Sequence, residues 1–210
     1  MNILRPLDRE QAPDASRDVM NSLENDLGQL PNLYRVLAHS PSALRAYAAL
    51  NKMLKDSGLT EEEQQVVLLT ASRENRCEYC MAAHSSGARA AGLDEDALES
   101  LREGEHIHND DRLEALRQFT QRVVAKRGRL EDEDVDVFLA AGFNEGNVLD
   151  VMLGVAMKTL SNYTNHIAET PLDDRFEDMN WDPNRDMRAR GGGRRRTDQT
   201  VPVRSGPYSH

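Results

Sequence analysis

The only two cysteines of the 210-residue chain, Cys77 and Cys80, lie three positions apart, and His84 follows four positions later. On a helix these spacings place side chains on one face, so the two sulfurs and the imidazole are expected to form one line. Cys77 is expected near the start of its helix, where a thiolate is favoured. A histidine beside a thiol can take its proton or, once protonated, lower its pKa from about 8.5 toward neutrality, and a second thiol can turn a sulfenic acid into a disulfide. The motif therefore predicts a peroxide-reducing or dithiol-exchanging site.

Two other interpretations of these residues stay open. Both cysteines could be core residues, because cysteine is often buried; His84 and the polar segment RENR before Cys77 would then need a separate explanation. The motif could also supply three zinc ligands, with His106 or His108 as the fourth. Structural zinc usually staples loops, which a long regular helix does not need. The redox interpretation, with no metal, accounts for the whole motif.

Helical signals surround the motif along most of the chain. Thr60-x-x-Glu63 is a capping box, in which each side chain bonds a free backbone N–H at a helix start. The run QQVVLLTAS that follows is apolar around most of a helix, which predicts a central helix. Gly92 lies where the helix from Cys77 to Ala91 needs a C-terminal cap. Further helices are expected at about 14–27, 31–41, 42–57, 94–102, 111–127, 131–141 and 145–166.

The fold class is predicted to be all-α. No strand alternation is visible, and aromatic residues are only 5% of the chain, which favours helix over sheet. Residues 1–182 are expected to form one compact helical domain with its motif core at 60–102. Residues 183–210 are rich in Gly, Arg and Pro with almost no apolar periodicity, and this composition predicts a disordered basic tail.

Charge and composition limit the classes of partner. The formal net charge is −10; the segment 183–210 carries seven Arg and two Asp, which leaves −15 on residues 1–182. An acidic domain argues against nucleic acid as a partner. No secretory signal and no apolar run of about 18 residues is visible, so no membrane association is expected. With two cysteines the expected location is a reducing cytoplasm, and without a GxGxxG or phosphate-binding loop no cofactor is expected.

The segment EEEQQVVLLTASRENRCEYCMAAHSSGARAAGLDEDAL resembles the core motif of the carboxymuconolactone decarboxylase superfamily, in its alkyl hydroperoxidase D-like branch. LPNLYRVLAHSPSAL and NYTNHIAETPLDDRF resemble flanking segments of the same branch. The resemblance implies an all-helical fold that forms homo-oligomers, reduces hydroperoxides and is recharged by a dithiol electron donor. By position it implies that Cys80 attacks the peroxide, Cys77 resolves the intermediate and His84 is the base. The decarboxylase and lactonase-type branches lack this cysteine pair.

The chain departs from the pattern of that branch at two positions. Gln65 stands where the family has a glutamate, twelve residues before the first cysteine, and an amide cannot relay a proton as a carboxylate does. Glu62, one turn before Gln65 on the same face, and Glu74, expected in the loop before the motif, are candidate replacements in a proton relay. Tyr79 stands where the alkyl hydroperoxidase has a second histidine, and its phenol, with a pKa of about 10, is a poor base at neutral pH.

Two further expectations concern the pocket and the assembly. His166 follows a polar stretch at the end of an Ala-rich helix and is a candidate pocket residue. The helices around 66–69 and 148–157 carry more apolar residues than one surface stripe requires, which predicts a homo-oligomer. The main functional prediction is a thiol peroxidase; the alternative is a non-catalytic helical oligomer whose paired thiols sense oxidants or bind a partner.

Overall fold

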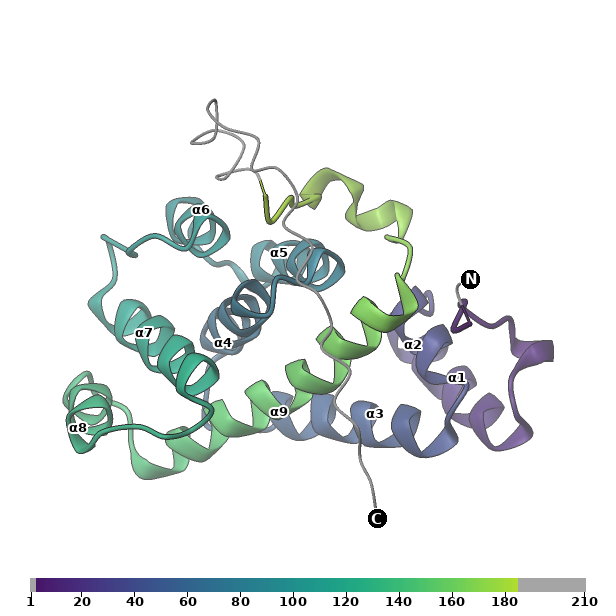
Figure 1. Ribbon diagram of the computed structural model, residues 1–210, viewed down its shortest axis with the longest axis horizontal. Helices are drawn as coiled ribbons and strands as arrows, with labels where there is room; N and C mark the ends of the chain where they lie inside the picture. The colour runs from purple at the N-terminus through teal and green to yellow at the C-terminus, as the bar shows by residue number, and fades with distance from the viewer. Residues whose placement is uncertain (1–2, 185–210) are drawn as a thin grey trace, which may run out of the picture.

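The computed structural model describes residues 3–184, and the described chain is helical with no strand. Figure 1 shows α1–α3 on one side, α6–α8 on the other, and α4, α5 and α9 between them. The predicted all-α class is confirmed; the predicted tail lies, from residue 185 onward, outside the described residues. The helices are α1 (Asp14–Leu27), α2 (Asn32–Leu37), α3 (Pro41–Lys55), α4 (Glu61–Glu74), α5 (Glu78–Ala91), α6 (Glu95–Glu103), α7 (Asp111–Lys126), α8 (Asp132–Ala140) and α9 (Glu145–Ala168), with 3₁₀ turns at Arg9–Gln11 and Asp174–Met179.

Helix α4 is the centre of the fold, as the sequence predicts. It packs against α5, α7 and α9, and its residues 66–72 are all buried. The capping box at its start is present: the Glu63 amide donates to the Thr60 hydroxyl at 3.2 Å, and the Thr60 amide donates to the Glu63 carboxylate at 2.9 Å. These two bonds satisfy N–H groups that no helical carbonyl can reach.

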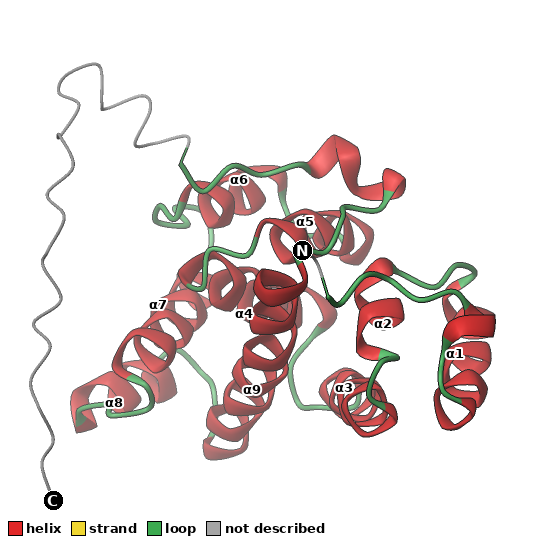
Figure 2. Ribbon diagram, turned by 45° about the vertical axis from the view of Figure 1, so that its right-hand side comes forward, coloured by secondary structure: helices red, strands yellow, loops and turns green. Residues whose placement is uncertain are grey.

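Two apolar cores lie on opposite sides of α4. One joins α4 to α6, α7 and α8 and contains the stacked rings of Phe119, Phe138 and Phe143. The other joins α1, α2 and α3 to α5 and contains both cysteines. Figure 2 shows α1, α2 and α3 as a group beside α9, away from α7 and α8. The cysteine motif therefore lies inside the second core rather than at the surface.

A tight turn between α4 and α5 sets the place of the motif. Polar residues do not end α4, which continues to Glu74; the chain turns at Arg76, whose φ of 57° is left-handed. The Cys77 amide then donates to the Ser72 carbonyl at 2.9 Å. Two boundaries differ from the sequence prediction: Glu74 is the last helical residue rather than a loop residue, and Cys77 is the N-cap residue of α5 rather than its first helical residue.

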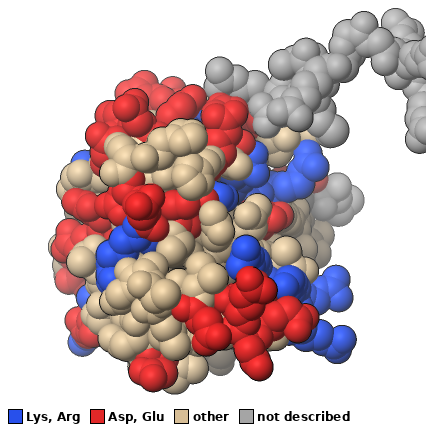
Figure 3. All heavy atoms as spheres, turned by 90° about the vertical axis from the view of Figure 1, so that its left-hand side faces the viewer, with Lys and Arg blue, Asp and Glu red and all other residues tan. Residues whose placement is uncertain are grey.

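Acidic side chains gather on the face formed by α6, α7 and α8 (Figure 3). Both α6 and α8 begin with acidic residues, which suits the positive end of a helix dipole. Such a face repels polyanions such as nucleic acid. No helix in the described part of the chain is long and apolar enough to cross a membrane.

Candidate active site

Cys77 and Cys80 converge in the second core, and each is only 1% exposed. The side-chain amide of Asn165, from α9, donates to Cys80 Sγ at 3.2 Å and reaches Cys77 Sγ at 3.8 Å. Ser161 Oγ, one turn earlier on α9, lies 3.9 Å from Cys80 Sγ. A single amide can touch both sulfurs only because the N-cap and the third helical residue of α5 lie one above the other.

The two thiols have opposite acidities. The hydrogen bond that Cys77 gives to Cys80, together with its burial, raises the pKa of Cys77. Burial alone would also raise the pKa of Cys80, but the hydrogen bond from Cys77, the charge and hydrogen bond of Lys158 and the contact with Ser161 outweigh it and hold the pKa of Cys80 well below its ordinary value. Cys80 is thus the more acidic sulfur of the pair, although the helix start alone would favour Cys77.

Lys158 of α9 is the positive charge beside Cys80. It is fully buried, and its Nζ lies 2.8 Å from His84 Nε2. Burial, followed by the Lys158 charge, lowers the pKa of His84, so the imidazole is neutral at pH 7. Its Nδ1 lies 3.1 Å from the side-chain oxygen of Gln65. The consistent tautomer donates from Nδ1 to Gln65 and accepts at Nε2 from Lys158, which engages both ring nitrogens.

Of the candidate relay residues, the structure brings only Gln65 into this network. Tyr79 donates to Asp173 at 2.5 Å and accepts from the Leu33 amide at 3.2 Å, and burial, then Asp173, raises its pKa. Glu74 accepts from Gln121 of α7 at 2.8 Å. Glu62 is exposed and lies beside Gly92, at the end of α5. Tyr79 lines both hollows beside the sulfurs, but its hydroxyl bonds to Asp173 and the Leu33 amide. In the described part of the chain, Glu74 and Glu62 make no hydrogen bond with the Lys158–His84–Gln65 network.

Sequence reasoning missed the buried polar stripe of α9. Lys158, Ser161, Asn162 and Asn165 follow the spacing i, i+3, i+4 and i+7, and each is at most 5% exposed. Asn162 accepts from Asn75 at 2.9 Å, which ties the stripe to the turn before the motif. The sequence does carry a signal for it: the four polar residues recur at helical spacing on one face of α9, and such a stripe is buried only when it has polar partners.

Separate hollows adjoin the two sulfurs. Cys80 lines a cavity of about 150 Å³ together with Tyr34, Tyr47, His84 and Lys158. Cys77 lines another hollow, of about 300 Å³, whose walls include Arg76, Asn165 and the candidate pocket residue His166. His166 thus lies on the Cys77 side of the motif, away from the cavity at Cys80.

The residues proposed as zinc ligands are not gathered into a site. His106 Nδ1 lies 3.0 Å from Glu114 on α7, and its ring packs edge-on against that of His108. Within residues 3–184 no group of three His, Cys, Asp or Glu side chains could hold a metal ion. The geometry gives the zinc interpretation no support.

Residues 41–122, which include α3 to α6, the cysteine motif and most of α7, match the model of the carboxymuconolactone decarboxylase family. This segment belongs to the carboxymuconolactone decarboxylase family. The match confirms the superfamily that the sequence resembles. No curated protein matches the chain.

Solved structures share the fold over most of their length. An uncharacterized peroxidase-related protein from Ralstonia eutropha JMP134, described as an alkylhydroperoxidase AhpD core, has 23% identity and a TM-score of 0.74, covering 85% of this chain and 97% of that one. A peroxidase-related protein from Silicibacter sp. TM1040 has 21% identity and a TM-score of 0.70, covering 83% and 94%. The debrominase Bmp8 has 18% identity and a TM-score of 0.67, covering 85% and 96%. The fold is therefore the AhpD-like helical fold.

Proposed function

We propose that the protein is a thiol-dependent peroxidase that cycles between the Cys77/Cys80 dithiol and a disulfide. The observation that carries the proposal is the buried pairing of Cys80 with the positive charge of Lys158, while Cys77 stays a thiol hydrogen-bonded to it. A low-pKa sulfur beside a second, protonated sulfur is the arrangement that peroxide reduction through a disulfide requires. The match to the family and the likeness to peroxidase-related structures support the same class of reaction.

The proposed chemistry uses only these residues and two substrates. The Cys80 thiolate attacks the outer peroxide oxygen, the O–O bond breaks, and the alkoxide leaves as an alcohol with a proton from the Lys158–His84 pair. Cys77 then attacks the sulfenic sulfur of Cys80, forming the disulfide and releasing water. In total the hydroperoxide and two thiols give an alcohol, water and a disulfide. A dithiol electron donor returns two electrons and two protons.

The two hollows suggest how the reactants are kept apart. The peroxide reaches Cys80 through the smaller cavity, and the dithiol meets Cys77 through the hollow that includes Asn165 and His166. Asn165 Oδ1 is buried without a hydrogen-bond partner among the described residues, so it is available to accept a hydrogen bond from an incoming thiol. A reducing cytoplasm would supply such a donor.

The test is turnover of a hydroperoxide with a dithiol. Purified protein with dihydrolipoamide should consume cumene hydroperoxide and tert-butyl hydroperoxide catalytically, and Cys80→Ser should abolish this. Cys77→Ser should stop after one equivalent, with a sulfenic acid on Cys80 that mass spectrometry detects. Oxidation of the wild-type protein once, with no turnover by any reductant, would favour the redox-sensor alternative and refute the peroxidase.

We also propose that the protein forms a homo-oligomer through the outer face of α9. Leu149, Met152, Tyr163 and Ile167 share this face and are 70%, 41%, 53% and 66% exposed. Apolar side chains in one stripe along 24 residues of helix are typical of a contact surface. The other expected interface, around residues 66–69, is wrong, because these residues are buried inside the chain against its own helices.

A further inference from the structure

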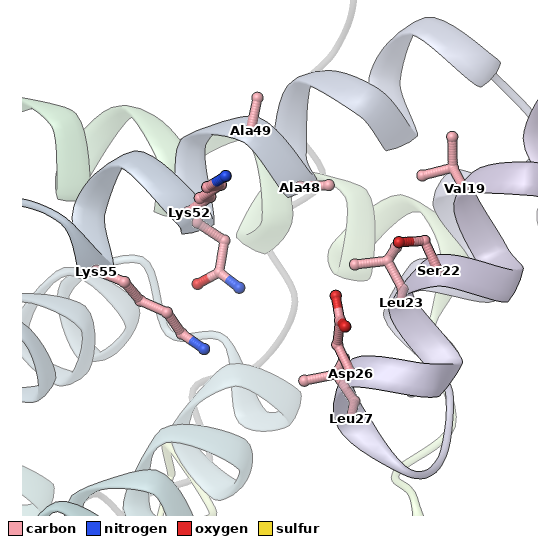
Figure 4. Close-up of a pocket in the computed structure, with 10 residues that line it drawn as sticks. Val19, Ser22, Leu23, Asp26, Leu27, Ala48, Ala49, Lys52 and Lys55 are labelled. Carbon is pink, nitrogen blue, oxygen red and sulfur yellow. The ribbon is translucent and has the colours of Figure 1, made fainter.

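A groove of about 530 Å³ runs between α1 and α3 (Figure 4). Its walls are largely apolar, with Val19, Leu23 and Leu27 from α1 facing Ala48 from α3. The volume lies in the range of small-molecule sites, and an apolar lining is what such sites share. The groove is therefore large enough for an extended apolar chain.

Two lysines give the groove its charge. Lys52 and Lys55, at the end of α3, line it together with Asp26 of α1. Figure 4 shows Lys55 and Asp26 extending into the space between the two helices. Within residues 3–184 none of the three has an ion-pair partner, so together they present one net positive charge. A single negative charge fits this set better than a dianion such as a phosphate.

The groove adjoins the cavity that contains Cys80. Leu27 and Asn51 line both the groove and the smaller cavity that contains Cys80. Tyr47, Asn51 and Lys55 follow each other at i, i+4 and i+8 on one face of α3, a rise of about 12 Å. Tyr47 lines the Cys80 cavity, whereas Lys55 lies in the groove. One side of α3 thus extends from the lysine end of the groove to the cavity that contains Cys80.

We propose that this groove binds the substrate, and that the substrate is an amphipathic hydroperoxide with one anionic head group. The carboxylate lies at Lys52 and Lys55, the apolar chain lies between α1 and α3, and the hydroperoxide lies in the adjoining cavity, at Cys80. This inference rests on the proposed peroxidase function and narrows its substrate. The chemistry at sulfur is unchanged: the hydroperoxide becomes an alcohol, and the carboxylate takes no part.

The experiment compares two substrates that differ only in the head group. Linoleic acid hydroperoxide and its methyl ester are reduced with dihydrolipoamide at equal concentrations, below the concentration at which either forms micelles. tert-Butyl hydroperoxide, which has no carboxylate head group, is the reference substrate. Two exposed ion pairs predict that wild-type kcat/KM favours the acid over the ester by about threefold to tenfold, through KM, and that added salt weakens this preference. In the double variant Lys52→Met/Lys55→Met the preference should disappear.

Two further variants sharpen the result. Ala48→Trp should fill the groove and lower kcat/KM for both linoleate substrates about tenfold or more relative to tert-butyl hydroperoxide, because the extra ring leaves no room for the chain. Lys126→Met removes a positive charge on α7, outside the groove, and should keep the preference for the acid. Equal rates for acid and ester in the wild-type protein, with tert-butyl hydroperoxide reduced normally, would overturn the inference and leave the peroxidase standing.

A binding measurement separates the groove from the reaction. Calorimetry with decanoate should show binding to the wild-type protein and to Cys80→Ser, and loss of binding in Lys52→Met/Lys55→Met. If no hydroperoxide is turned over but decanoate binds in this manner, the peroxidase fails and the groove stands as a site for an anionic amphiphile. Absence of decanoate binding to the wild-type protein would overturn the groove as a binding site.

Discussion

Replacement of Lys158 by Met tests most directly how Cys80 becomes reactive. Burial raises the pKa of Cys80, whereas the bond from Cys77 and the charge and hydrogen bond of Lys158 lower it, and the lowering effects win. Methionine keeps most of the lysine volume and removes the charge and the donor. The pKa of Cys80 should therefore rise. The variant should still fold, because Cys80 can take up a proton once the Lys158 charge is removed, so that no uncompensated charge stays buried.

The size of the effect follows from the bond that is lost. A hydrogen bond to a charged group contributes about 1.5–3 kcal/mol, and about 1.4 kcal/mol is a factor of ten. At pH values below the lowered wild-type pKa of Cys80, the thiolate population, and with it the second-order rate of alkylation at Cys80, should fall by about ten- to a hundredfold. In the wild-type protein the rate should fall only when the pH drops through the lowered pKa, whereas in the variant this fall should move to higher pH.

Iodoacetamide kinetics from pH 5 to 10, with mass spectrometry to locate the modified cysteine, would measure this change. Lys126→Met, which removes a lysine charge on α7, is the matched control and should keep the wild-type profile. His84→Gln removes the hydrogen-bond partner of Lys158 but leaves the charge of Lys158 in place. The pH profile of alkylation in this variant should therefore move less than in Lys158→Met. A profile that shifts in His84→Gln but not in Lys158→Met would refute the reasoning and return the role of base to His84.

Three further predictions concern stability and assembly. Tyr79→Phe removes the bond to Asp173 and should lower the free energy of unfolding by about 1–3 kcal/mol in urea titrations; an unchanged midpoint would show that this bond contributes nothing net. Burial opposes ionisation of Glu114, but hydrogen bonds, first from Arg117, lower its pKa to about 2, so its contribution is present above the unfolded pKa of 4.5 and is lost as the pH falls toward 2. Acid titrations of stability should therefore fall more steeply between about pH 5 and 2 for the wild-type protein than for Glu114→Gln, and parallel curves would contradict this. Met152→Glu, on the exposed face of α9, should shift light scattering toward the 23.6 kDa monomer, whereas a monomeric wild-type protein would remove the proposed interface.

The helical architecture is largely predictable from the sequence, because its signals are local. The capping box at Thr60 and Glu63 and the glycine at Gly92 mark helix ends through backbone bonds within a few residues, and all three act as predicted. The end of α4 is not predictable in the same way. The segment before Cys77 is polar, but polarity does not end a helix; the left-handed Arg76 does, and a left-handed arginine has no sequence signature comparable to glycine.

Only the part of the site that belongs to a single helix could be predicted from the sequence. The motif belongs to α5, with Cys77 as its N-cap residue and Cys80 and His84 within it. The proximity of these three residues therefore follows from their spacing in the sequence. The positive charge that helps to lower the pKa of Cys80 comes from Lys158, 74 residues beyond His84, and only tertiary packing brings it there. A lysine in an apolar helix is normally assigned to the surface, because its burial is costly without a partner.

The departure from the family pattern at Gln65 is compatible in physical terms with the buried Lys158. A carboxylate at position 65 would accept from His84 Nδ1 and favour the imidazolium, which would add a second positive charge 2.8 Å from Lys158. The neutral amide of Gln65 instead accepts from a neutral imidazole, which leaves Nε2 free to accept from Lys158. A glutamine at this position is thus compatible with a buried lysine, and the lysine supplies the positive charge that the thiolate needs. In the proposed mechanism the ammonium of Lys158, held by His84, therefore takes the place of a carboxylate–histidine pair as the group that activates Cys80.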